Sequence, residues 1–357
     1  MGLKVGIVGV GPVGDRLVRV LQERKFPVDG ELKVMATYER EEILADRPFY
    51  VHKIDETVFK GLDVVFFAGR EGAKGVSFQW GREATKSGCV VIDNGGDFRM
   101  YPNYPLVVPE VNMDAVTKDT RYICNPNCST IQMVVALAPL HKAAKLRRVV
   151  VSTYQSVSGF GEVAMEQMKT EAAQVLAGQV PEHNPSVFAH PISFNCIPHI
   201  DKFLPNGYTK EEMKMINETR KIFDEPNLLI NATTVRVPVL IGHSESINAE
   251  FELPIDREKA FEILSDPKKS PGVVLMDGPA SDPAASNVRN DPNEQQYPVA
   301  GDLAEEKYKD AVLVGRLRND TTVKNAINLW CVSDNLRKGA ATNAVQIAEE
   351  MLKRGLL

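Results

Sequence analysis

The first third of the chain alternates short apolar runs with segments of helical periodicity, and this alternation limits the folds that it can adopt. Strands separated by helices imply right-handed crossovers and a mostly parallel sheet. The expected strands are Lys4–Val8, Leu32–Tyr38, Leu62–Ala68 and Cys89–Asp93, and the expected helices are Arg16–Arg24 and Val76–Lys86. The pattern predicts an α/β domain with a Rossmann-type parallel sheet.

A glycine-rich turn joins the first expected strand to the first expected helix, which is where a G-x-G-x-x-G sequence binds a dinucleotide. Glycines let the backbone approach a pyrophosphate, whose charge is met by the helix N-terminus. A tight strand-to-helix turn can also use glycine for packing alone. The expected cofactor-binding residues of the turn are Gly9, Gly11, Pro12, Val13 and Gly14.

Glu39 and Arg40 follow the second expected strand and give opposite indications of the cofactor. An acid at this place accepts hydrogen bonds from the ribose hydroxyls of NAD, whereas a basic residue accommodates the 2′-phosphate of NADP. Both side chains can also be ordinary solvated charges. These two residues therefore leave the choice between NAD and NADP open.

Cys128 stands where the chain turns from an extended stretch, Thr120–Cys124, into a helical pattern, Ser129–His141. Unpaired N–H groups and the positive end of the helix dipole stabilise a thiolate there, which lowers the pKa of the thiol. Cys128 is therefore the candidate nucleophile, and its alternative is a buried apolar role. That role is the one expected for the other cysteines, Cys89, Cys124, Cys196 and Cys331.

After Cys128 the pattern becomes that of a second α/β domain with a mixed sheet. Ser246–Leu253 alternates polar and apolar residues, which is typical of a strand with one wet face. Ser265–Gln296 is rich in Pro, Asp, Asn and Ser and is expected to be a long surface loop or a partner-facing insertion. The other expected elements are strands over Arg147–Thr153, Thr233–Leu240 and Ala326–Val332, and helices over Glu162–Ala177, Lys210–Phe223 and Gly339–Arg354.

Composition and charge exclude several classes of function. A net charge of −5 and the lack of a basic segment argue against nucleic-acid binding. No apolar run approaches the length of a membrane span, and the N-terminus lacks the pattern of a secretory signal. Five cysteines scattered over 357 residues fit a reducing compartment better than a disulfide framework. We therefore expect a cytoplasmic protein without membrane, nucleic-acid or metal binding.

Several separated motifs resemble, in the same order, those of the aspartate-semialdehyde dehydrogenase family. They are Asn127–Thr130, Ser152–Gly159, Val235–Pro238, Gly242–Glu245, Asn328–Trp330 and Asn335–Ala340. The resemblance implies a homodimer that reduces L-aspartyl 4-phosphate to L-aspartate 4-semialdehyde with NADPH and releases phosphate, on the way to lysine, threonine and methionine. It also implies a dinucleotide-binding domain over residues 1–127, a catalytic and dimerisation domain over 128–335, and a C-terminal helix in 336–357 that returns to the first domain.

The resemblance further implies a role for each matching residue. Cys128 is expected to form an acyl thioester, Gln155 to orient the substrate, and His243 to act as acid and base. The expected substrate-binding residues are Arg236 for the carboxylate, Glu211 for the amine, and Lys214, Arg99 and Asn127 for the phosphate. Ser158, Gly159 and Asn343 are expected to bind the cofactor.

The chain departs from the family pattern around the cofactor. Glu39 takes the place of the usual basic residue, which favours NAD over NADP. Asp97 places a carboxylate near the expected phosphate site. The run Ala68–Gly72 differs from the glycine and serine run that is usual in the family. Two other interpretations stay open: the reductase of N-acetylglutamyl phosphate, which usually has glycine where this chain has Asn127, and a homologue that binds nucleotide without catalysis.

Overall fold

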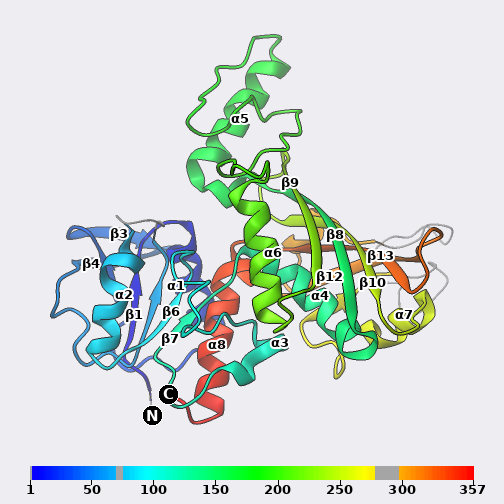
Figure 1. Cartoon of the computed structure of the whole chain (residues 1–357). Helices are drawn as coiled ribbons and strands as arrows, with labels where there is room; N and C mark the ends of the chain where they lie inside the picture. The colour runs from blue at the N-terminus through cyan, green and yellow to red at the C-terminus, as the bar shows by residue number, and fades with distance from the viewer. Residues whose placement is uncertain (1, 70–74, 278–296) are drawn as a thin grey trace. The chain divides into compact units, whose positions relative to one another are not determined.

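The computed structural model describes residues 2–69, 75–277 and 297–357, and the chain forms two compact units. Unit 1 comprises Met1–Cys128 and Gly339–Leu357, and unit 2 comprises Ser129–Lys338. Figure 1 labels the helices and strands of both units. The chain therefore leaves unit 1 after Cys128 and re-enters it at Gly339.

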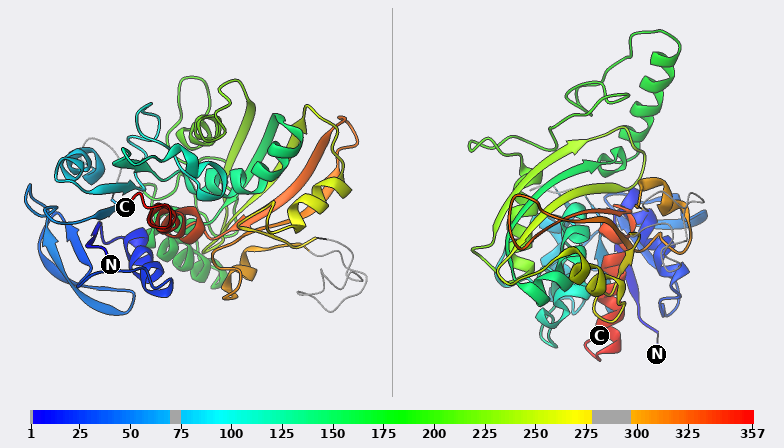
Figure 2. Two further views of the ribbon diagram at one scale, coloured as in Figure 1. Left: turned by 90° about the horizontal axis from the view of Figure 1, so that it is seen from below. Right: turned by 90° about the vertical axis from the view of Figure 1, so that its right-hand side faces the viewer.

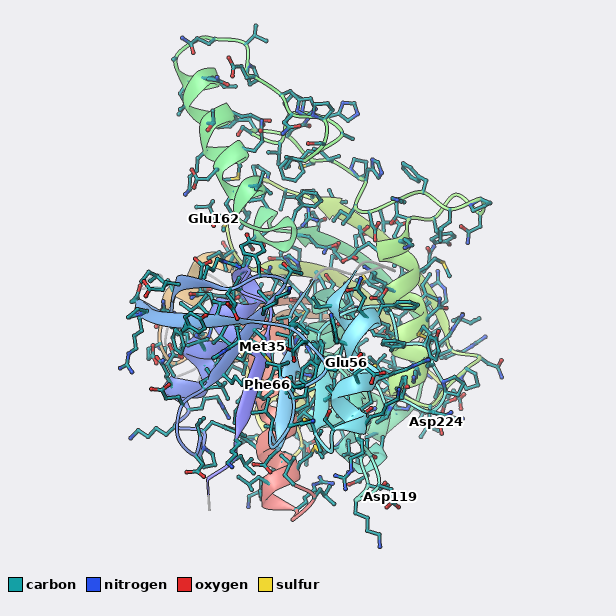
Figure 3. All side chains as sticks on the ribbon, turned by 90° about the vertical axis from the view of Figure 1, so that its left-hand side faces the viewer. Met35, Glu56, Phe66, Asp119, Glu162 and Asp224 are labelled. Carbon is teal, nitrogen blue, oxygen red and sulfur yellow. The ribbon has the colours of Figure 1, made fainter. Side chains whose placement is uncertain are left out.

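Unit 1 is built on a seven-stranded sheet of order β3-β4-β2-β1-β5-β6-β7, in which β3 alone is antiparallel to its neighbour. The strands are β1 (Val5–Val8), β2 (Lys33–Ala36), β3 (Arg40–Leu44), β4 (Arg47–Lys53), β5 (Val64–Phe67), β6 (Val90–Asp93) and β7 (Tyr122–Cys124). Every residue of β1, β5 and β6 is buried, as in a sheet covered on both faces. Met35 and Phe66 lie among these strands (Figure 3) and are fully buried. The predicted Rossmann-type sheet is confirmed.

The helices of unit 1 are α1 (Pro12–Glu23), α2 (Val76–Lys86), the short α3 (Pro109–Asn112) and α8 (Thr342–Lys353). A π-helical turn, Arg337–Ala341, leads into α8. Ala344, Ile347 and Met351 of α8 are fully buried in the same hydrophobic core as β1 and β6. A salt bridge of 2.6 Å from Arg24 to Glu349 joins the end of α1 to α8. The last helix is thus an integral part of the core of unit 1.

The hairpin of β3 and β4 is absent from the sequence-based expectations. Its two turn residues, Ala45 and Asp46, have φ values of 49° and 63°. Turns of this kind usually show Asn-Gly or Asp-Gly, because those residues adopt positive φ easily. Since Ala-Asp carries no such signal, the hairpin is not recognisable from the sequence.

Unit 2 is built on a six-stranded mixed sheet of order β11-β12-β13-β10-β8-β9. The strands are β8 (Leu146–Gln155), β9 (Leu229–Arg236), β10 (His243–Phe251), β11 (Val273–Leu275), β12 (Val312–Asn319) and β13 (Ala326–Ser333). Along most of β10, buried residues alternate with half-buried ones. The predictions of a mixed sheet and of one wet face are therefore confirmed.

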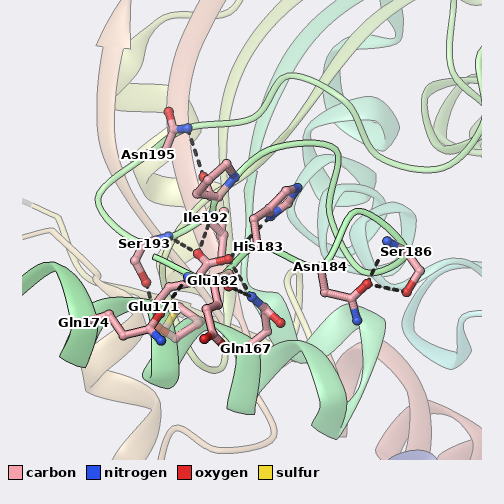
Figure 4. Close-up of polar contacts among 12 residues, drawn as sticks. Gln167, Glu171, Gln174, Glu182, His183, Asn184, Ser186, Ile192, Ser193 and Asn195 are labelled. Atoms are coloured by element: carbon pink, nitrogen blue, oxygen red, sulfur yellow. Dashed lines mark hydrogen bonds and ion pairs between the residues drawn. The ribbon is translucent and has the colours of Figure 1, made fainter. Parts of the chain in front are cut away.

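Helices α4 (Cys128–Ala144), α6 (Lys210–Ile222) and α7 (Arg257–Ser265) pack on the other face of this sheet. Helix α5 (Glu162–Leu176) and the segment after it stand away from the strands (Figures 1 and 2). Glu171 fastens that segment to α5, because its buried carboxylate accepts hydrogen bonds from the backbone N–H groups of Ile192 at 2.7 Å and Ser193 at 3.0 Å (Figure 4).

Three expectations are wrong. The strand expected over Thr233–Leu240 is β9, Leu229–Arg236, so that residues 237–240 lie outside it. Cys196 is exposed, whereas Cys89, Cys124 and Cys331 are buried as predicted; the run around Cys196 belongs to the segment after α5 and forms no strand of the sheet. The expected loop from Ser265 contains β11, which pairs in parallel with β12. Three residues are too few to show a period, so the sequence pattern misses this strand. Residues 278–296 of that loop, and residues 70–72 of the departing run, lie outside the described residues.

The described part of the chain contains no helix that is both long and apolar enough to cross a membrane. Within the same residues, no group of three or more His, Cys, Asp and Glu side chains is arranged to hold a metal ion.

Candidate active site

Cys128 is the first residue of α4 and follows directly on the turn at Asn125–Asn127, as the sequence predicts. The backbone N–H of Asn125 donates to the carbonyl of Asp93 at 2.7 Å, which holds this turn against the end of β6. Cys128 is partly exposed, and Asn127 beside it is buried. N–H groups in the first turn of a helix have no intrahelical acceptor, so they stabilise an anion at this position.

A network of amides, the buried Asn125 and Asn343 and the half-buried Asn94, braces the turn before Cys128 within unit 1. Nδ2 of Asn343 donates to Oδ1 of Asn125 at 2.7 Å, and Nδ2 of Asn125 donates to Oδ1 of Asn94 at 2.9 Å. Arg99 joins the network through its Nη2, which donates to the carbonyl of Asn94 at 2.7 Å. Two expected site residues, Arg99 and Asn343, are thus connected through Asn94 and Asn125, to which sequence analysis assigns no role.

The glycine turn of unit 1 fits a dinucleotide. Gly9 has φ of 109°, and a Cβ on Gly14 would lie 2.1 Å from the carbonyl oxygen of Gly9, so the turn itself requires both glycines. A Cβ on Gly11 would meet no atom of the described residues within 4 Å, which leaves its backbone open to a ligand. Pro12 and Val13 form the first turn of α1, and its N-cap Gly11 offers no side chain to cap it. The N-terminus of α1 can therefore receive a phosphate.

The turn after β2 presents Glu39 and holds Arg40. Glu39 is exposed between β2 and β3. Nε of Arg40 donates to the carboxylate of Glu42 at 2.9 Å, and its guanidinium lies 4.5 Å from the centre of the Tyr38 ring. Arg40 is therefore engaged by Tyr38 and Glu42, and Glu39, which interacts with the Tyr50 hydroxyl, is the more exposed of the two charges.

Three of the expected site residues lie together in unit 2. Gln155 ends β8 and is buried, and its Nε2 donates to Oε1 of Glu211 at 3.1 Å. The other carboxylate oxygen of Glu211 lies 3.5 Å from Nζ of Lys214. A capping box between Thr209 and Glu212 starts α6 at this point. The local sequence thus places Glu211 and Lys214 in the first turns of a helix, where Glu211 contacts both Gln155 and Lys214.

Arg236 and His243 form a second cluster in unit 2. Arg236 ends β9 in register with Gln155, and His243 begins β10. Nη1 of Arg236 donates to the carbonyl of Ser156 at 2.7 Å. A Cβ on Gly159 would lie 2.9 Å from this nitrogen and 3.4 Å from Nε2 of His243. The absence of a side chain at Gly159 therefore leaves room for Arg236 and His243.

His243 is fully buried and contacts Ser156 through its Nδ1. The backbone N–H of Ser156 donates to Nδ1 at 3.0 Å, and Oγ of Ser156 lies 3.1 Å from the same nitrogen. Burial, together with the charge of Arg236, lowers the pKa of His243 to about 3, although Glu211 opposes this shift. The imidazole is therefore neutral at physiological pH. Its Nε2 is buried and has no hydrogen-bond partner among the residues that the structure describes.

Asn335 is connected to His243 through Ser156 and Gly242, a role that the sequence alone does not indicate. Its Oδ1 accepts hydrogen bonds from Oγ of Ser156 at 3.0 Å, Oγ of Ser158 at 3.1 Å and the backbone N–H of Gly242 at 3.0 Å. The hydroxyl of Ser158, expected to bind the cofactor, is thus directed at Asn335. Both serines and Asn335 lie inside motifs visible in the sequence, but only the folded chain brings them together.

Two protein-family models match the chain in succession. The model described as "Semialdehyde dehydrogenase, NAD binding domain" matches residues 4–119. The model described as "Semialdehyde dehydrogenase, dimerisation domain" matches residues 137–338. Together with the Rossmann-type sheet and the glycine turn, these matches define a semialdehyde dehydrogenase with a nicotinamide cofactor.

Relatives with established names narrow this class. The chain is 46% identical to the aspartate-semialdehyde dehydrogenase of Aquifex aeolicus, over 100% of both chains. The crystal structure of aspartate semialdehyde dehydrogenase II from Vibrio cholerae matches with a TM-score of 0.87 and 42% identity over 99% of each chain. A structure of the same enzyme complexed with ASA matches with a TM-score of 0.86 and 41% identity, again over 99% of each chain. The chain belongs to the aspartate-semialdehyde dehydrogenase family.

Family membership confirms what the sequence motifs imply about the reaction. The protein is an oxidoreductase of amino-acid biosynthesis, and it interconverts L-aspartyl 4-phosphate and L-aspartate 4-semialdehyde with a nicotinamide cofactor.

Proposed function

We propose that Cys128 is the nucleophile of this reaction and carries the acyl group as a thioester. Its thiolate displaces phosphate from the acyl carbon, and a thioester accepts hydride far more readily than a carboxylate. When bound, the nicotinamide cofactor supplies that hydride. The observation that best supports this role is the position of Cys128, a partly exposed residue, at the N-terminus of α4.

The remaining site residues bind the substrate in this proposal. The guanidinium of Arg236 holds the substrate carboxylate through two parallel hydrogen bonds, which suits its planar geometry. Glu211 binds the amine, and Gln155, already hydrogen-bonded to Glu211, orients the acyl group. The cations Arg99 and Lys214, with Asn127, stabilise the departing phosphate. His243 exchanges a proton with the substrate at its buried Nε2.

Cys128→Ala tests the nucleophile, with Cys196→Ala as the matched control because Cys196 is also accessible. We expect phosphate-dependent oxidation of aspartate semialdehyde to fall roughly ten-thousandfold in the first variant and to stay unchanged in the second. Iodoacetamide at neutral pH should label Cys128 before Cys196 and abolish turnover. Full activity of Cys128→Ala would overturn the proposal. A slow, unselective thiol in a wild-type protein without turnover would favour the non-catalytic homologue.

For the cofactor, we propose that the enzyme accepts NAD as well as NADP, or prefers it. Glu39 is exposed and suited to a ribose diol, while Arg40 is engaged with Glu42 and Tyr38. The test compares kcat/KM with NAD and NADP in wild type and in Glu39→Arg. We expect the variant to shift the ratio toward NADP by at least about tenfold, or about 1.4 kcal/mol. Glu41→Arg, exposed on β3, controls for added charge, and a strong NADP preference of the wild type would refute the proposal.

We also propose that the protein is a cytoplasmic homodimer. In this proposal residues 1–127 bind the dinucleotide, residues 128–335 carry catalysis and dimerisation, and residues 336–357 complete the first domain. The match of a dimerisation-domain model to 137–338 supports this. The open face of the unit 2 sheet also supports it, because Tyr154 and Trp330 lie there with ring centres 5.2 Å apart. Sedimentation equilibrium should give about twice the chain mass of 39.5 kDa. A monomer at micromolar concentration would contradict the proposal.

A further inference from the structure

We propose that Asn335 is a positioning residue that holds the segments around His243 so that the proton of the neutral imidazole resides on Nε2. The inference rests on the proposed acid–base role of His243 and deepens it, because a neutral imidazole with its proton on Nε2 starts as the donor toward the substrate, and Nε2 accepts a proton only after it has given this one up. The hydrogen bonds at Nδ1 of His243 and at Oδ1 of Asn335 support this inference.

The partner of Nδ1 decides the tautomer. A neutral imidazole has one N–H and one nitrogen with a lone pair. The backbone N–H of Ser156 donates to Nδ1 of His243 at 3.0 Å. A backbone N–H cannot accept a hydrogen bond, so Nδ1 presents its lone pair and the single proton lies on Nε2. This nitrogen faces the space beside Gly159 and Arg236.

The Ser156 hydroxyl is compatible with this tautomer. Its Oγ lies 3.1 Å from Nδ1 of His243 and 3.0 Å from Oδ1 of Asn335. If the hydroxyl donates to Nδ1, the lone pair of Nδ1 accepts from both the hydroxyl and the backbone N–H of Ser156. If the hydroxyl donates to Asn335, Nδ1 accepts from the backbone N–H alone. In both cases the N–H of Ser156 keeps a proton away from Nδ1.

Asn335 connects the two segments that must stay in place for this contact. Its Oδ1 accepts from Ser158, which lies two residues after Ser156 in the 3-10 turn Val157–Phe160, and from the N–H of Gly242, which immediately precedes His243. The side-chain oxygen of Asn335 therefore holds both the segment that contains Ser156 and the segment that contains His243. All the side chains concerned are buried, so water does not replace these bonds easily.

An uncharged acceptor suits this position. The charged groups that face His243 in the described structure are Arg236 of β9 and Glu211 of α6, and the balance of burial and these charges keeps the imidazole neutral. A carboxylate at position 335 would accept the same three hydrogen bonds but would add a negative charge beside the imidazole, which favours imidazolium. Asparagine supplies the acceptor without that charge.

The test reads the tautomer directly, by NMR of the full-length enzyme labelled with ¹⁵N-histidine, with His243→Gln used to identify the His243 signals. We expect Nε2–H and an unprotonated Nδ1 in wild type. Asn335→Ala should give mixed tautomers and lower kcat at least about tenfold, with a smaller change in KM. Asn335→Asp should keep the fold and raise the pH of the acidic limb of kcat. Asn195→Ala, at an exposed position in the segment after α5, is the control and should change none of these.

Two outcomes would overturn the inference: an Nδ1–H tautomer in the wild-type enzyme, or unchanged tautomer and pH profile in both Asn335 variants. If the Asn335 variants are unchanged while His243→Gln is inactive, the inference fails and the proposed role of His243 stands. If His243→Gln is fully active, the proposed role of His243 fails, whatever tautomer is found.

Discussion

Nδ2 of Asn343 donates a hydrogen bond of 2.7 Å to Oδ1 of Asn125 in the interior of unit 1, where both side chains are buried. Asn343 belongs to α8, and Asn125 belongs to the turn that leads into Cys128. The same nitrogen of Asn343 also donates to the carbonyl of Val107 at 3.0 Å. The two bonds tie the last helix of the chain to the segment that presents the proposed nucleophile.

Asn343→Ala removes the donor of both bonds. Because buried acceptors that lose a donor cost about 1–3 kcal/mol, we expect the free energy of unfolding to fall by that amount in urea titrations. Lys353→Ala is the control on the same helix, since its salt bridge with Glu350 is exposed and is worth less than about 0.5 kcal/mol. Equal stabilities of the two variants would show that the amide network contributes nothing.

Gly159→Ala should damage catalysis more than stability. The added Cβ would lie 2.9 Å from Nη1 of Arg236 and would have to displace it. Small displacements of substrate-binding groups are costly, so kcat/KM for aspartate semialdehyde should fall about tenfold or more. Gly301→Ala is the matched control, because a Cβ there meets no atom of the described residues within 4 Å. An active Gly159→Ala enzyme would mean that Arg236 moves without penalty.

Glu245→Gln should change the pH dependence of stability. Glu245 is fully buried on β10 and accepts a hydrogen bond from the thiol of Cys331 at 3.4 Å, and burial raises the pKa of its carboxyl well above the usual 4.5. The native state therefore binds this proton more tightly than the unfolded state, and the stability that the group contributes is lost as pH rises above 4.5. Glutamine has the same shape and does not ionise.

We therefore expect Glu245→Gln to be more stable than wild type at pH 8 by about 1 kcal/mol or more, with the difference vanishing near pH 4. Urea midpoints measured between these values check the slope. Glu262→Gln, at an exposed position on α7 where paired lysines lower the pKa of the carboxyl, should not reproduce this trend. A difference that is constant with pH would contradict the protonated state of Glu245.

Glu171→Ala should loosen the segment after α5 without unfolding the sheets. It leaves the N–H groups of Ile192 and Ser193 without their acceptor, which costs about 2–4 kcal/mol locally. Limited proteolysis should then cut residues 182–195 at least about tenfold faster, as mass spectrometry can map. Glu166→Ala, which removes only an exposed pair with Lys169, is the control. Equal cleavage rates would show that Glu171 does not hold the segment.

Much of the fold is predictable from the sequence, because its strands are short apolar runs with clear ends and its helices are strongly periodic. The bounds expected for α2, Val76–Lys86, match the structure, and those of α5 and α6 differ by one residue. The hairpin at Ala45 and Asp46 escapes prediction because its turn lacks the usual residues. Cys196 shows the opposite error, because its neighbours in the sequence are apolar but the residue is exposed in the structure.

The candidate site is predictable as a set of residues but not as an arrangement. Motifs identify Gln155, Glu211 and His243 separately, and their roles remain predictions. The contacts among them depend on the register of β8 with β9 and β10, which no local pattern specifies. Asn335 illustrates the limit, since its partners Ser156 and Gly242 lie 179 and 93 residues away in the sequence.

The position of α8 in the chain has a consequence for folding during translation. A ribosome makes the sheet of unit 1 first, then the whole of unit 2, and only afterwards the helix whose Ala344, Ile347 and Met351 fill the interior of unit 1. The residues of unit 1 that precede unit 2, Met1–Cys128, therefore keep apolar surface in water until α8 has been translated. The part that emerges earliest is the part that matures latest.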